Sequence, residues 1–143
     1  MLSQRTVAFL ETFAQASNLI YPDGGFLFRY QFDYNQAHGH LSGDLLHALR
    51  NDDATQYADV SARDLNELAR FFQGALGNHT HDVASGNAIR TAKALIDYLK
   101  EDLSNDLIGL AVDEGSDDMT ASFEMASKAT NNYSWLELYW SVE

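Results

Sequence analysis

Residues 26–34 read Phe-Leu-Phe-Arg-Tyr-Gln-Phe-Asp-Tyr, with an aromatic side chain at every second position. Successive side chains of a β-strand point to opposite faces of the sheet, so this period predicts a strand with one aromatic face. The intervening residues are mostly polar, which is typical of a face that contacts solvent. We expect the aromatic face to pack under helices. The alternative, in which the rings stack on nucleic-acid bases, is disfavoured by the acidity of the chain.

The segments on either side of this strand have helical and turn signals. Residues 3–19 show apolar side chains at helical spacing, with Ser3 as a candidate N-cap. Residues 21–25 (Tyr-Pro-Asp-Gly-Gly) form a turn signal, because proline presets φ and glycine accepts positive φ. The N-terminal region is therefore expected to be a helix that turns directly into a strand.

The middle of the chain is predicted to be helical. Apolar residues recur at helical spacing in residues 43–50, 61–76 and 86–103. Ser61 and Ser85 stand at the starts of the second and third segments, where a side-chain oxygen can accept a backbone N–H.

The C-terminal third changes period. Residues 107–112 form a short apolar run, and residues 119–127 and 134–142 alternate in polarity. Turn-forming residues separate the three segments, so we expect an antiparallel meander. A helix over residues 116–129 is the alternative.

Length and composition complete the fold prediction. The chain has 143 residues, near the commonest size of one domain, and 45% of them are hydrophobic, which indicates a folded protein. We therefore predict a single domain over residues 1–143. Its class is α+β, with about four helices packed on one face of an antiparallel sheet of about four strands: strand 26–34 plus the C-terminal meander.

The net charge excludes several kinds of partner. With 9 basic and 21 acidic residues the formal charge is −12. Direct nucleic-acid binding needs a basic face, and docking on anionic membranes is disfavoured for the same reason. No apolar run approaches the roughly 20 residues of a membrane helix. Glu11 and Gln15 interrupt any signal-peptide core, so a cytoplasmic protein is expected. The oligomeric state stays open, a homo-oligomer included.

Acidic residues concentrate in one part of the chain. Between positions 97 and 124 only Lys100 opposes them. Such a concentration costs stability through self-repulsion, and one reason to keep it is a basic partner. The alternative is an ordinary solvated surface that aids solubility. The acidic residues of this segment are Asp97, Glu101, Asp102, Asp106, Asp113, Glu114, Asp117, Asp118 and Glu124.

The favoured function is accordingly a non-enzymatic inhibitor or adaptor. It would bind a basic nucleic-acid-handling protein or toxin through the acidic segment, as a nucleic-acid mimic does. Tyr133, Trp135 and Tyr139 share one face of the last predicted strand and could anchor the interface. No catalytic residue and no cofactor belong to this interpretation.

The histidines support an alternative function. The chain contains two His-x-His pairs, whose imidazoles point the same way on extended backbone and can bind one metal ion. Zinc, manganese or iron would suit nitrogen and oxygen ligands, giving a small metal-dependent hydrolase. Solvated loop histidines without a role are the simpler interpretation. The candidate ligands are His38, His40, Asp44, His47, His79, His81 and Asp82.

Cysteine is absent, which removes disulfides, thiolate metal ligands and a cysteine nucleophile. The sequence also lacks a P-loop, a dinucleotide-binding glycine motif and a serine nucleophile elbow. The binding protein is preferred over the metal-dependent hydrolase because the charge asymmetry is read directly from the sequence, whereas convergence of the His-x-His pairs is assumed.

Overall fold

The structure is a computed structural model of the whole chain. It describes residues 2–20, 26–34, 47, 51, 62–76, 86–103, 107–114, 119–127 and 132–142. Helices and an antiparallel sheet coexist in the described residues, which confirms the α+β class.

The N-terminal helix α1 spans Gln4–Ile20. Ser3 caps it as predicted: the Thr6 N–H donates to Ser3 Oγ at 3.3 Å, and the Val7 N–H donates to the Ser3 carbonyl at 3.0 Å. Leu10 and Phe13 are buried on its inner side, at the spacing of one helix turn. The cap and the apolar stripe together define where α1 begins and which side of it packs.

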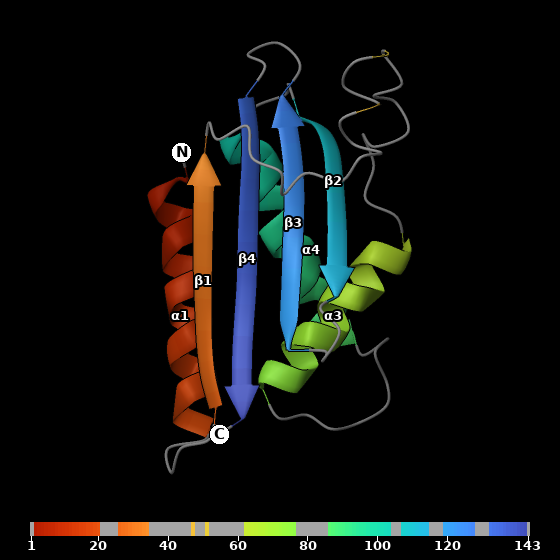
Figure 1. Ribbon diagram of the computed structural model, residues 1–143. Coiled ribbons are helices and arrows are strands. Elements are labelled where there is room, and N and C mark those ends of the chain that lie inside the picture. The colour runs from red at the N-terminus through yellow and green to blue at the C-terminus, as the bar shows by residue number, and fades with distance from the viewer. Residues whose placement is uncertain are drawn as a thin grey trace.

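The sheet has four strands in the order β1-β4-β3-β2, and every neighbouring pair is antiparallel. The strands are β1 (Phe26–Tyr34), β2 (Leu107–Glu114), β3 (Thr120–Ser127) and β4 (Asn132–Val142). The predicted meander is therefore present, and its last strand lies between β3 and β1 (Figure 1). The alternative helix over residues 116–129 is wrong, because β3 occupies 120–127, and half-buried and buried side chains alternate over 120–125.

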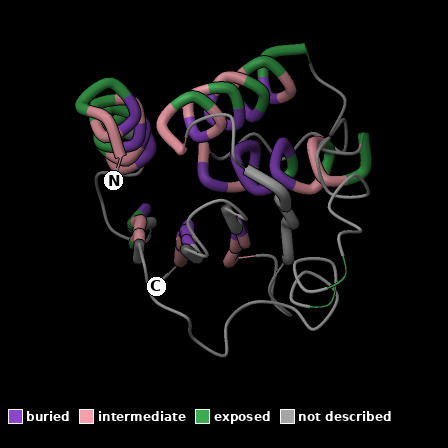
Figure 2. Tube along the Cα trace, turned by 90° about the horizontal axis from the view of Figure 1, so that it is seen from above, coloured by how far each residue is buried: buried purple, intermediate pink, exposed green. Residues whose placement is uncertain are grey.

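All three described long helices cover the same face of the sheet. They are α1, α3 (Ala62–Ala75) and α4 (Gly86–Asp102). Seen from above, the helices form one layer and the strands a second (Figure 2). The predicted helix over residues 43–50 lies outside the described residues except at His47, which is helical.

Aromatic rings fill the space between the two layers. Phe13 of α1 meets Phe72 of α3 with ring centroids 4.5 Å apart, and meets Phe28 of β1 at 4.7 Å. Phe28 is 2% exposed, so the aromatic face of β1 packs under helices as predicted. Gly74 of α3 packs against the buried indole of Trp140, so α3 and β4 approach each other closely at this point.

None of the described helices is long and apolar enough to cross a membrane.

Candidate partner-binding surfaces

The structure distributes the predicted acidic residues over both layers. Asp97 and Glu101 are exposed on α4, in the helical layer. Glu124 of β3 alternates with buried Phe123 and Met125, so it lies on the opposite face of the sheet. The described carboxylates of the acidic segment therefore do not form one continuous face.

The remaining acidic positions are described in part or not at all. The backbone of Asp113 pairs with Ser122, and that of Glu114 pairs with Ala121, in the β2–β3 ladder. The structure does not describe Asp106, Asp117 or Asp118.

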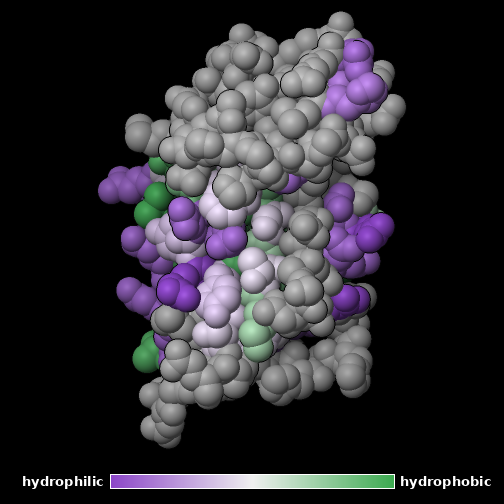
Figure 3. All heavy atoms as spheres, viewed as in Figure 1, coloured by the Kyte–Doolittle hydropathy of each residue, from purple (hydrophilic) through white to green (hydrophobic). Residues whose placement is uncertain are grey.

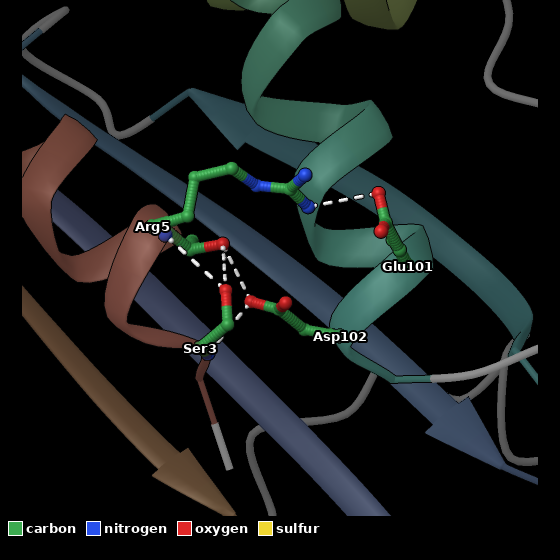
Figure 4. A network of polar contacts seen from close by, with 5 residues as sticks. Ser3, Arg5, Glu101 and Asp102 are labelled. Atoms are coloured by element: carbon green, nitrogen blue, oxygen red, sulfur yellow. Dashed lines mark hydrogen bonds and ion pairs between the residues drawn. The ribbon is translucent and has the colours of Figure 1, made fainter.

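Asp102 binds the beginning of α1 instead of facing outward. Its Oδ2 accepts the Ser3 backbone N–H at 2.9 Å and the Thr6 hydroxyl at 2.5 Å (Figure 4). Burial opposes the charged carboxylate, but the hydrogen bonds from Ser3 and Thr6 outweigh it and hold the pKa of Asp102 below its usual value. The positive end of the α1 dipole favours the same charge.

Glu101 is engaged in a similar way. It accepts a hydrogen bond from the Arg5 guanidinium at 2.8 Å, and this hydrogen bond raises the pKa of Arg5. The guanidinium also lies 4.2 Å from the ring centroid of Tyr98, whose edge meets Phe9. We define Ser3, Arg5, Thr6, Glu101 and Asp102 as the α1–α4 clamp. Two of the predicted partner-binding carboxylates thus hold two helices together.

The face of the sheet away from the helices carries a different set of side chains. We call this surface the open sheet face. Figure 3 looks onto it and shows pale side chains, of intermediate hydropathy, beside strongly hydrophilic ones. By alternation with buried residues, its members are Arg29, Gln31, Ser122, Glu124, Trp135, Glu137 and Tyr139.

The β1–β4 register brings the polar members of this face together. Arg29 pairs with Tyr139 and Gln31 pairs with Glu137. The Arg29 guanidinium lies 4.8 Å from the centroid of the Tyr139 ring, within cation–π range. A shallow cavity of about 470 Å³ opens here, lined by these four residues and Tyr30. Burial, with Glu11 of α1 nearby, raises the pKa of Tyr30.

Two of the three predicted anchors lie on this face. Trp135 and Tyr139 are half-buried there, two positions on either side of Glu137. Tyr133 belongs to β4, but its side chain lies outside the described residues. Arg29 and Gln31 were not among the predicted site residues; the polar positions of the 26–34 pattern are the signal that identifies them.

Most of the predicted metal ligands lie outside the described residues: His38, His40, Asp44, His79, His81 and Asp82. His47 is exposed, and its ring nitrogens lie 2.9 and 3.1 Å from the Asn51 side-chain nitrogen. Among the residues that the structure does describe, no group of three or more His, Asp and Glu side chains is placed to hold a metal ion. The metal site stays a prediction from sequence.

Comparison with known proteins found no matching family model, no matching curated protein and no matching solved structure.

Proposed function

We propose that this protein is a non-enzymatic inhibitor or adaptor that binds a basic protein through the open sheet face. One observation carries the proposal: Glu124 and Glu137 share this face with Trp135 and Tyr139, on the side of the sheet opposite the helices.

Carboxylates beside large aromatic rings suit a basic partner for two reasons. Aromatic side chains at the centre of an interface supply most of its binding energy, with charged groups at the rim. The net charge of −12 steers a basic protein towards this chain and speeds association. Trp135 and Tyr139 are then the energetic anchors, and Glu124 and Glu137 select for a cationic surface.

The carboxylates of the helical layer are expected to contribute less to binding. Glu101 and Asp102 hold α1 against α4, so recruiting them to a partner would cost intramolecular contacts. Asp97 is exposed on the same helix and contributes to the long-range field. Neutralising Asp97 or Glu137 changes the net charge equally, which makes Asp97 a matched control.

The test is an affinity capture from cells of the source organism, followed by titration calorimetry with the captured protein after its purification. We expect a basic protein that is retained at low salt and released at high salt. Tyr139→Ala should weaken binding by roughly 30-fold or more, as the loss of an interface anchor does. Glu137→Gln should weaken binding more than Asp97→Asn.

Three results would contradict this function: a partner without a basic surface, binding that is insensitive to salt, or equal effects of Glu137→Gln and Asp97→Asn. A duplex DNA competitor identifies the class of partner. Displacement by DNA indicates that the bound surface is a nucleic-acid channel, and retention indicates a toxin or another basic protein.

A further inference from the structure

A second depression lies in the helical layer, between α1 and α4, with a volume of about 530 Å³. Phe9 and Phe13 of α1 and Leu76, just after α3, supply its apolar lining. Thr12 and Thr91 flank it from α1 and α4, and Arg5 and Tyr98 line it towards the α1–α4 clamp. We call this depression the α1–α4 groove. Its volume and its mainly apolar lining with a few polar groups are typical of small-molecule sites.

The apolar character continues along α1 beyond the groove. Arg5, Thr12 and Leu19 are spaced seven residues apart and therefore lie on one side of the helix. Leu19 is 76% exposed and is the one large hydrophobic side chain with high exposure in the described residues. From Arg5 to Leu19 this side is on the order of 20 Å long, because a helix rises about 1.5 Å per residue.

At the N-terminal end of this side of α1, Arg5 supplies a positive charge. The Arg5 side chain is 46% exposed and that of Glu101 69%, and an ion pair exposed to this extent is weak because water and salt screen it. A guanidinium has five N–H donors, and that of Arg5 lies 4.2 Å from the centroid of the Tyr98 ring. Arg5 is therefore able to donate hydrogen bonds to another carboxylate, beside Glu101 or in its place.

We propose that the α1–α4 groove binds an amphipathic carboxylate of the fatty-acid type. The carboxylate pairs with Arg5, and the acyl chain runs along α1 over the half-buried Phe9 towards the exposed Leu19. Both ends of the ligand match the surface: an anion meets the guanidinium, and a hydrocarbon chain covers apolar side chains that are otherwise hydrated. This site lies in the helical layer and does not depend on the open sheet face.

The test measures binding of dodecanoate, below its micelle-forming concentration, by titration calorimetry with the full chain. We expect saturable binding with one molecule per chain. The methyl ester should bind at least about tenfold more weakly, because it has no charge to pair with Arg5. Glu101→Gln should strengthen dodecanoate binding, because it removes the competing carboxylate.

Two tryptophan variants locate the site. Thr12→Trp fills the groove from an exposed position and should weaken binding at least about tenfold, whereas Asn66→Trp, exposed on α3 outside the groove, should leave it unchanged. Circular dichroism of each variant checks that the fold is retained.

The proposal is overturned by any of three results: no saturable binding to the wild-type chain, equal affinity for dodecanoate and its ester, or equal effects of the two tryptophan variants. The ester comparison needs no mutation, so it stays decisive if Thr12→Trp fails to fold.

Discussion

Gly74 shows how a single position depends on its neighbour across the two layers. A Cβ atom built there would lie 2.7 Å from Cζ2 of Trp140 and 3.2 Å from Cε2. The indole is a rigid ring in the core, only 9% exposed, and has little room to move. Glycine at this position is explained by the close approach of α3 to β4.

Gly74→Ala should therefore destabilise the protein, although alanine ordinarily favours a helix. The gain in helix propensity is at most about 1 kcal/mol, whereas overpacking a core costs about 1–3 kcal/mol. We expect a lower free energy of unfolding, by about 1–2 kcal/mol in urea denaturation.

Gly86→Ala is the matched control. Its Cβ would meet only the Arg90 guanidinium, at 3.5 Å, so the change should stay within about 0.5 kcal/mol. In a Trp140→Phe background the cost of Gly74→Ala should shrink, because the ring that it strikes is smaller. Equal costs in both backgrounds would show that the indole is not the cause.

At the scale of elements, the α1–α4 clamp determines how the first helix is held. Asp102 accepts hydrogen bonds from both the backbone and a side chain at the start of α1. Asp102→Asn removes the charge and should lower the free energy of unfolding at neutral pH by about 1–2 kcal/mol. Asp97→Asn, on the same helix but exposed, should change it much less.

The same clamp predicts a pH dependence. The folded state holds the pKa of Asp102 below its ordinary value of 3.8, so its stabilising effect is complete at pH values above that. The effect is lost as the pH falls through the folded-state pKa. Thermal melts of the wild type and of Asp102→Asn should therefore converge below about pH 4. A difference that persists unchanged well below pH 4 would contradict the role of the charge.

The edge strand β1 is held by α1 through one further contact. Asn18 Oδ1 accepts the Phe28 N–H at 3.0 Å, which satisfies a backbone donor at the edge of the described sheet. Asn18→Ala should lower the free energy of unfolding by about 1 kcal/mol and increase self-association, because unpaired edge amides pair with other chains. Denaturation and analytical ultracentrifugation measure the two effects. Asn66→Ala, on the exposed side of α3, should show neither.

For the whole molecule, charge opposes folding. A net charge of −12 on 143 residues repels itself in the compact state, and salt screens this repulsion. Raising the ionic strength from about 0.01 to about 0.15 M shortens the Debye length from about 30 to about 8 Å, so Tm should rise. At pH near 4.5, the calculated isoelectric point, the same change should have little effect on dilute protein. A Tm that falls with salt at neutral pH would mean that ion pairs outweigh repulsion.

The alternation in the sequence predicted β1 and β4 together with their faces, whereas it left a helix open as an alternative to β3. Phe28 and Leu138 are buried, whereas Arg29 and Tyr139 lie on the open sheet face, because a period of two assigns each side chain to one face. Ser3 likewise revealed the start of α1. These features depend on residues close together in the chain.

Sequence alone could not predict the α1–α4 clamp, nor that the acidic segment is divided between the two layers. Ser3 and Asp102 are far apart in the chain and meet only because α1 and α4 pack side by side. Glu101 and Glu124 are closer in sequence but belong to different layers, because Glu101 is exposed on helix α4 and Glu124 lies on the outer face of strand β3. Proximity along the chain was therefore a poor guide to a shared surface.

The position of β4 in the sheet has a consequence for synthesis on the ribosome. This strand bonds to β1 on one side and to β3 on the other, although it is the last of these strands to be translated. Until it emerges from the exit tunnel, β1 lacks the one strand with which it pairs in the described part of the chain. Folding then depends on pairing the first strand with the last, which is entropically slow. The nascent chain is thus an expected client of chaperones that hold exposed aromatic segments until translation has passed β4.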